Sequence, residues 1–129
     1  MSVASLDTNV VLRLLLNDVP EHAKAAANFV GRSSCYITDV VVAECVFVLE
    51  KAYKFDRRVI TESLMNLFDL NTLAFNEAVI TNAFELYLSS RALSFADCYS
   101  VAEAALRENE LLTFDKAILK KCGPTVRQP

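Results

Sequence analysis

Short runs of apolar residues alternate along the chain with longer segments in which apolar residues recur every three or four positions. The short runs predict buried β-strands, and the periodic segments predict helices with one apolar face. Strands are expected at residues 3–6, 35–38, 72–75 and 111–114, with a further strand near Val126. Helices are expected at residues 21–30, 39–53 with Asp39 as N-cap, 56–70, 76–89, 94–108 and 115–121. Residues 10–16 either continue the first strand or start a helix, and the preceding Asp7-Thr8-Asn9 favours the helix.

This alternation of strands and helices predicts an α/β fold. Parallel strands that are covered by helices on both faces appear in a sequence as short apolar runs, so a parallel sheet of four to five strands is expected. The 129 residues suit one domain, and the chain shows neither an internal repeat nor a linker. We therefore expect a single domain over residues 1–129, with a flexible or partly ordered tail at about 123–129.

Composition and charge exclude several classes of protein. Apolar residues make up 53% of the chain and only two residues are glycine, which excludes a disordered tail, a collagen-like repeat and a low-complexity segment. Thirteen basic and 16 acidic residues give a net charge of −3, without the basic excess that is usual in a nucleic-acid-binding domain.

Targeting and cysteine patterns favour a cytoplasmic protein. The first residues lack the basic start of a signal peptide, and the longest apolar run, residues 40–49, is far shorter than the roughly 20 residues of a membrane helix. The four cysteines include no C-x-x-C pair, and His22 is the only histidine, so a zinc site is not expected. We expect reduced thiols, a surface position for His22, and no association with a membrane.

Four acidic residues occupy positions where an open parallel sheet forms its sites. Asp7 follows the first predicted strand and Asp115 follows the strand at 111–114. Ligands bind such sheets at the carboxyl ends of the strands. Glu44 and Asp97 lie on predicted helices next to those ends, so we expect the four carboxylates to converge.

Each of these acids also has a purely structural interpretation. Asp7 and Asp115 can be N-caps of the helices that follow them, and Asp97 stands three residues after Ser94, as in a capping box. Glu44 differs, because apolar residues flank it on nearly all sides and predict that its helix is buried. A buried carboxylate without a partner costs several kcal/mol, and no basic residue lies at helical spacing within four positions of Glu44. Its partner would be a distant arginine or a metal ion.

Together the four acids indicate a site for a divalent cation. Carboxylates that converge without a cation repel one another. Ligand sets made only of oxygen atoms suit hard ions such as Mg²⁺ or Mn²⁺. A pair of such ions about 3.5–4 Å apart can drive in-line attack on a phosphodiester. The sequence therefore predicts phosphodiester hydrolysis with one or two ions. Setting the four acids aside leaves one more basic than acidic residue in the rest of the chain, so the net charge does not exclude RNA as substrate.

Four short motifs, in this order, resemble those of a known family. They are Leu6-Asp7-Thr8-Asn9-Val10, Val42-Ala43-Glu44-Cys45, Phe95-Ala96-Asp97-Cys98-Tyr99 and Leu112-Thr113-Phe114-Asp115-Lys116. Their order and spacing resemble those of the PIN-domain ribonucleases, particularly the VapC toxins of bacterial type II toxin–antitoxin pairs. The resemblance covers essentially the whole chain. Two positions depart from the family pattern: Cys98 follows Asp97 where many members have a small residue such as alanine, and Phe114 precedes Asp115 where a second polar or acidic residue is common.

The resemblance implies a three-layer α/β/α sandwich and an endoribonuclease that requires Mg²⁺ or Mn²⁺. It also implies a homodimer that a cognate antitoxin protein silences. In this hypothesis Asp7, Asp97 and Asp115 ligate the metal, and Glu44 ligates it or orients the attacking water. The supporting residues are Asn9, Thr113 and Ser94, which supply neutral oxygens or hold the acids in place. Phosphate contacts are expected from Lys116, Arg13 and Lys120, with Lys116 the best placed because it directly follows Asp115.

Three alternative functions stay open at this stage. One is a non-catalytic PIN-like module that binds RNA or protein. Another is a phosphatase of the haloacid-dehalogenase type, which would need an acidic residue where Asn9 stands. The third is a receiver domain, which would need an acidic pair after the first strand, where this chain has only Asp7.

Overall fold

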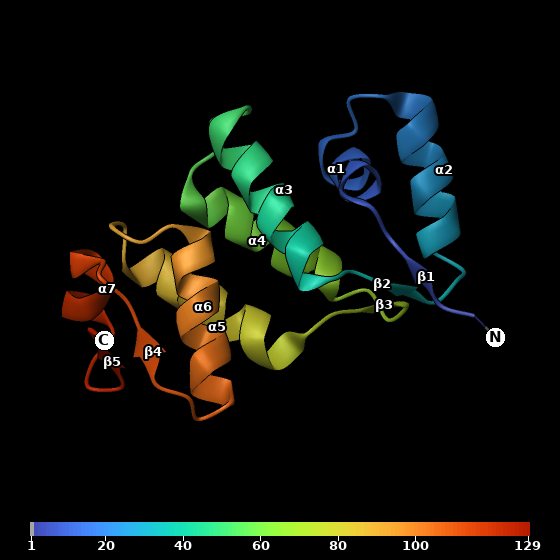
Figure 1. Cartoon of the computed structure of the whole chain (residues 1–129). Helices are drawn as coiled ribbons and strands as arrows, with labels where there is room; N and C mark the ends of the chain where they lie inside the picture. Colours follow the sequence, from blue (N-terminus) through green and yellow to red (C-terminus); the bar gives the residue numbers. More distant parts are fainter. Residues whose placement is uncertain (1) are drawn as a thin grey trace. The chain divides into compact units, whose positions relative to one another are not determined.

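Two compact units make up the computed structural model, which describes residues 2–129 (Figure 1). Unit 1 is Met1–Asn76, described from residue 2 onward, and unit 2 is Glu77–Pro129. Among the described residues, no helix is both long and apolar enough to cross a membrane.

Unit 1 contains a three-stranded parallel sheet. Its elements are β1 (Ala4–Ser5), α1 (Thr8–Leu16), α2 (Pro20–Val30), β2 (Cys35–Tyr36), α3 (Asp39–Lys51), α4 (Arg57–Phe68) and β3 (Leu73–Ala74). The strands lie in the order β1-β2-β3, with Ala4 opposite Cys35 and Cys35 opposite Leu73. Helix α1 contacts α2, α3 and α4. The parallel sheet expected from the sequence is thereby confirmed.

The starts of the helices in unit 1 follow from local sequence. Helix α2 begins with Pro20, which lacks a backbone N–H and suits the first helical turn. Helix α4 begins after Asp56, whose carboxylate accepts a hydrogen bond from Val59 N at 2.9 Å. The predicted N-cap of α3, Asp39, is wrong by one residue. Thr38 is extended and its Oγ1 accepts a hydrogen bond from Val41 N at 3.2 Å, so Asp39 is already the first helical residue.

Unit 2 is built on a pair of helices and a two-stranded ladder. Its elements are α5 (Glu77–Ser89), α6 (Phe95–Leu106), β4 (Leu111–Leu112), α7 (Lys116–Lys121) and β5 (Val126–Arg127). Helices α5 and α6 pack along each other (Figure 1). Between ring centroids, Phe95 lies 4.8 Å from Phe84 and 5.7 Å from Tyr87. Strands β4 and β5 are parallel, and α7 forms the crossover between them.

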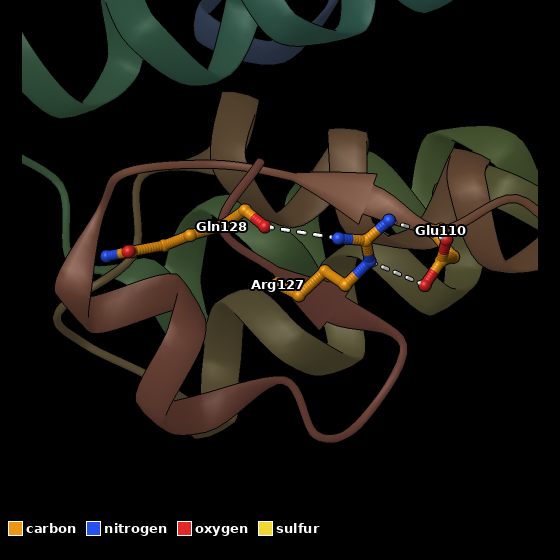
Figure 2. A network of polar contacts seen from close by, with 3 residues as sticks. All are labelled: Glu110, Arg127 and Gln128. Carbon is orange, nitrogen blue, oxygen red and sulfur yellow. Dashed lines mark hydrogen bonds and ion pairs between the residues drawn. The ribbon is translucent and has the colours of Figure 1, made fainter.

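An ion pair ties the end of the chain to β4. The Arg127 guanidinium faces the Glu110 carboxylate (Figure 2). Arg127 Nε donates to Glu110 Oε2 at 2.9 Å, and Arg127 Nη2 donates to Glu110 Oε1 at 3.3 Å. Arg127 Nη1 also donates to the carbonyl oxygen of Gln128 at 3.3 Å. The pKa of the Glu110 carboxyl is held below its ordinary value, mainly by the hydrogen bonding of Arg127 to Glu110 and next by the positive charge of Arg127. Strand β5 is thus held beside β4 by a side-chain contact as well as by the ladder.

The predicted single sheet of four to five strands is not confirmed. Within residues 2–129 the five strands form one sheet of three strands and another of two. Each strand contributes only two residues to its ladder. An apolar run in the sequence shows that a strand exists, but it does not show which strand it pairs with. The single domain over residues 1–129 likewise stays a prediction.

Candidate functional site

Asp7 stands at the N-cap position of α1 but does not cap the helix with its side chain. Its backbone is extended, with φ −77° and ψ 161°, and its carbonyl oxygen accepts hydrogen bonds from Val10 N and Val11 N at 3.0 and 3.2 Å. The carboxylate accepts no capping bond from α1, all of whose residues are described, and Asp7 is exposed. The structural interpretation of Asp7 as a side-chain cap is therefore wrong, and its carboxylate is available for a ligand.

Glu44 is exposed, so the prediction of a buried carboxylate is wrong. Helix α3 buries one complete stripe, formed by Val42, Cys45, Val46 and Leu49. Glu44 lies on the opposite face with Val40 and Phe47, which are 66% and 64% exposed. Counting apolar neighbours along the sequence overestimated burial, because residues at positions 40, 44 and 47 share a face that turns away from the core.

A hydrogen bond joins the start of α1 to the middle of α3. Thr8 Oγ1 donates to Glu44 Oε2 at 3.1 Å, and Thr8 is buried. Thr8 directly follows Asp7 in the sequence, and its hydroxyl restrains one oxygen of the Glu44 carboxylate. Thr8 is a site residue that the sequence reasoning missed. The signal available was a hydroxyl between Asp7 and Asn9, at the point where an apolar helix begins.

The pKa of the buried Cys45 thiol is affected by two of the predicted acids, Glu44 and Asp7. Burial raises the pKa of Cys45 to about 12, and the negative charges of Glu44 and then of Asp7 contribute to this rise. Both carboxylates are therefore within electrostatic range of this thiol. The thiol itself stays protonated at neutral pH, so Cys45 is not a nucleophile.

Asp97, in unit 2, takes part in a capping box at the start of α6. Ser94 Oγ accepts a hydrogen bond from Asp97 N, and Asp97 Oδ2 accepts one from Ser94 N, both at 3.1 Å. Asp97 also has a neighbour at the end of α7, because its charge adds to burial in raising the pKa of the Cys122 thiol. A carboxylate has about four acceptor positions, so the capping box uses only part of its capacity.

Asp115, also in unit 2, is the N-cap of α7 and uses its side chain for this purpose. Asp115 Oδ1 accepts hydrogen bonds from Ala117 N at 2.9 Å and from Ile118 N at 3.1 Å. Thr113 Oγ1 accepts a hydrogen bond from Asp115 N at 3.0 Å, which fixes the backbone before the helix. Both capping bonds end on Oδ1, and the residue is exposed. Asp115 can therefore cap α7 and still offer Oδ2 to a ligand.

The remaining predicted residues have varied surroundings. Asn9 and Arg13 line a shallow pocket of about 470 Å³ in unit 1, and His22, also in its lining, is exposed as expected. Arg13 Nε lies 3.0 Å from Asp18 Oδ1, so this guanidinium already has an anionic partner. Lys116 and Lys120 are exposed on α7.

Each unit supplies two of the four predicted acids. Within residues 2–129, neither unit by itself groups three His, Cys, Asp or Glu side chains in a way that could hold a metal ion. The pairs are Asp7 with Glu44 in unit 1 and Asp97 with Asp115 in unit 2. A site that combines all four acids stays a prediction.

The chain matches the model of the PIN domain family over residues 4–124. A comparison with curated proteins found no match. The matched segment contains all four predicted acids, together with Thr8, Ser94 and Thr113. PIN domains are commonly nucleases, and such nucleases usually use divalent metal ions. Because the match covers nearly the whole chain, this protein belongs to the PIN-domain family.

Proposed function

We propose that this protein is a metal-dependent endoribonuclease that hydrolyses RNA phosphodiesters. The observation that carries the proposal is the arrangement at the start of α1. There, in a PIN domain, the Asp7 carboxylate takes no part in capping, and the neighbouring Thr8 restrains Glu44 through its hydroxyl. The Asp7 carboxylate makes no capping bond to α1 and is exposed, so its oxygens are open to a ligand.

The donor chemistry of the four acids fits a hard divalent ion. Asp7, Glu44, Asp97 and Asp115 offer only carboxylate oxygens, which Mg²⁺ and Mn²⁺ prefer over the softer nitrogen and sulfur ligands. In unit 1 the carboxylates of Glu44 and Asp7 both act electrostatically on the Cys45 thiol. A cation would relieve the repulsion between these two carboxylates. We propose that all four acids hold one or two ions, in a three-layer sandwich with a single central sheet.

The chain's own residues then have distinct tasks. The Thr8 hydroxyl restrains Glu44 Oε2, and Oε1 would hold the ion or accept the proton of the attacking water. Capping bonds fix the positions of Asp97 and Asp115 on unit 2. When bound, a divalent ion supplies an acidified water and positive charge beside the leaving oxygen.

Phosphate binding is assigned to the exposed lysines of α7. Lys116 and Lys120 follow Asp115 on the same short helix and are exposed. Arg13 contributes less to this task, because Asp18 already occupies its guanidinium. Binding through these two lysines is expected to weaken as salt rises, because phosphate neutralisation releases counterions.

RNA cleavage assays with matched variants test the proposed activity. The wild type is expected to cleave single-stranded RNA with Mg²⁺ or Mn²⁺ and to stop when a chelator is added. Asp7→Asn and Glu44→Gln are expected to lose at least about 100-fold in rate, because each removes a charge that acts on the reacting groups. The controls are Asp69→Asn and Glu62→Gln, which neutralise exposed acids on α4 or at its end and are expected to keep full activity. Cleavage by Asp7→Asn at the wild-type rate would contradict the proposal.

The biological role proposed for this activity is that of a cytoplasmic toxin in a toxin–antitoxin pair. The partners are the RNA substrate, a second copy of this chain and a small antitoxin protein. Support comes from the exposed apolar side chains Val40 and Phe47 on α3, which suit a protein contact. Induced expression of the wild type is expected to arrest growth, and Asp7→Asn is not. Relief of the arrest by the product of a neighbouring small gene would support the pairing, and growth unaffected by the active enzyme would contradict the toxin role.

A further inference from the structure

Phe114 is the most exposed large apolar side chain among residues 2–129, with 74% of its surface open to solvent. It directly precedes Asp115, at the position where the resemblance to the family predicts a polar or acidic residue. An aromatic ring held in water next to a proposed metal-binding acid has no part in the core of unit 2. The ring is therefore open to contact with a ligand that offers a flat apolar surface.

The backbone around Phe114 is fixed on both sides. Thr113 N donates to the carbonyl oxygen of Arg127 at 3.1 Å, which continues the β4–β5 ladder up to the residue before the ring. On the other side, Asp115 N donates to Thr113 Oγ1, and Asp115 caps α7. The ring is thus presented from a backbone that needs little further ordering when a ligand binds, which lowers the entropic cost of the contact.

The charges beside Phe114 identify the kind of ligand. Lys116 and Lys120 are exposed one helical turn apart on α7, and Asp115 separates them from the ring in sequence. Sites for single-stranded nucleic acids combine an aromatic ring, on which a base stacks, with cations that follow the phosphates. The core of a protein–protein interface is instead depleted in such charges. Leu112, two residues before Phe114, is 49% exposed.

We propose that Phe114 is a stacking platform for a nucleobase of single-stranded RNA, with Lys116 and Lys120 on the adjoining phosphates. The proposal rests on the proposed nuclease function for the identity of the strand, and it adds a residue that selects unpaired RNA over duplex. Bases in a duplex are stacked on one another and cannot lie on the ring unless they are first splayed out.

Binding of RNA without cleavage isolates this contact. The full-length chain is titrated in chelator against a fluorescent single-stranded RNA of about ten nucleotides, with anisotropy as the readout. Phe114→Ala is expected to weaken binding roughly 5- to 100-fold, the range known for loss of one stacked base. Phe114→Trp restores binding, because any aromatic face can stack. Phe55→Ala removes another exposed ring, in unit 1, which does not line the pocket of Asn9 and Arg13, and is expected to leave binding unchanged.

The RNA itself provides a second arm of the test. An RNA that carries abasic sites in place of its bases is expected to bind the wild type and Phe114→Ala equally, because it has no base to stack. A hairpin duplex of the same length is expected to bind more weakly than the single strand, and Phe114→Ala should narrow that difference.

The outcomes separate this proposal from the nuclease assignment. Phe114→Ala that binds RNA as the wild type does, or a wild type that binds no RNA, overturns the stacking platform. If Phe114→Ala alters self-association in sedimentation but leaves RNA binding unchanged, the ring contacts a second copy of the chain and the proposal is wrong. RNA binding that depends on Phe114, without cleavage in Mg²⁺ or Mn²⁺, supports the platform and contradicts only the proposed catalysis. Equal melting temperatures of wild type and Phe114→Ala, expected for an exposed ring, show that binding changes do not arise from unfolding.

Discussion

Asp7 and Asp115 occupy equivalent places in their two units, yet their carboxylates do different work. Each follows a strand and stands at the N-cap of the next helix. The Asp115 side chain accepts two hydrogen bonds from α7, whereas the Asp7 side chain accepts none from α1. An aspartate at the N-cap position therefore caps its helix through its side chain in unit 2 but not in unit 1.

The second acid of each pair repeats this difference. Asp97 closes a capping box with Ser94, so its charge and its bonding both support the start of α6. Glu44 is held by Thr8 on an exposed face of α3, where it supports no helix end. The Asp7 side chain therefore serves no helix, Glu44 joins α3 to α1 through Thr8, and the acids of unit 2 support the starts of their helices. Substitutions of these acids can separate their contribution to ligand binding from their contribution to helix capping.

The largest effect expected on stability is that of the metal ion. Mn²⁺ at 100 times its dissociation constant is expected to stabilise the folded wild type by about 2.7 kcal/mol, because the unfolded chain lacks the site. Asp7→Asn should show much less of this gain, and a chelator should abolish it. Thermal or urea unfolding with and without Mn²⁺ measures the difference. A wild type whose stability does not respond to Mn²⁺ or Mg²⁺ would contradict a shared metal site.

Removal of the caps comes next in size. Asp115→Ala is expected to lower the free energy of unfolding by about 1 kcal/mol, whereas Asp115→Asn keeps an acceptor for Ala117 N and Ile118 N and costs far less. Asp7→Ala, measured without metal, is expected to cost little, because no bond from α1 is lost. Urea unfolding measures the stability of the three variants. If Asp7→Ala loses as much stability as Asp115→Ala, the distinction drawn between the two aspartates is wrong.

The smallest expected effect concerns the pair of Glu110 and Arg127, an exposed contact away from the four acids. The pKa of the Glu110 carboxyl is lowered in the folded chain, so its stabilising contribution is complete above the ordinary glutamate value of about 4.3. That contribution disappears as pH falls through the lower pKa of the folded state. Glu110→Gln should therefore be slightly less stable than the wild type near neutral pH and equal to it in acid. Glu85→Gln, an exposed glutamate on α5, is the control. A difference that persists in acid would show that Glu110 acts through packing rather than charge.

The sequence predicted most of the local structure, because periodicity and capping residues act over a few positions. The strands before Asp7 and Asp115, the helix after each, and the capping box at Ser94 all follow from neighbouring residues. The pairing of strands did not follow, because ladders of two residues carry little information about their partners. The exposure of Glu44 was missed because its apolar neighbours were counted without dividing α3 into a buried and an exposed face.

The distinction between Asp7 and Asp115 could not be obtained from the sequence at all. An aspartate before a helix is equally suited to cap it or to leave its carboxylate for a ligand, and only the side-chain geometry separates the two cases. The bond from Thr8 to Glu44 joins residues 36 positions apart, so local patterns contain no trace of it. Long-range contacts of this kind are what the fold adds to the sequence.

The central proposal is that Asp7, Glu44, Asp97 and Asp115 are metal ligands, and Mn²⁺ binding to single-charge variants tests it most directly. Calorimetric or spin-resonance titration compares the wild type with Asp7→Asn, Asp115→Asn and the control Asp69→Asn. We expect Asp7→Asn and Asp115→Asn each to weaken Mn²⁺ binding by at least about 10-fold, and Asp69→Asn to bind Mn²⁺ as the wild type does. Asp115→Asn with unchanged Mn²⁺ affinity, beside a loss in Asp7→Asn, would contradict the claim and leave Asp115 with its cap alone.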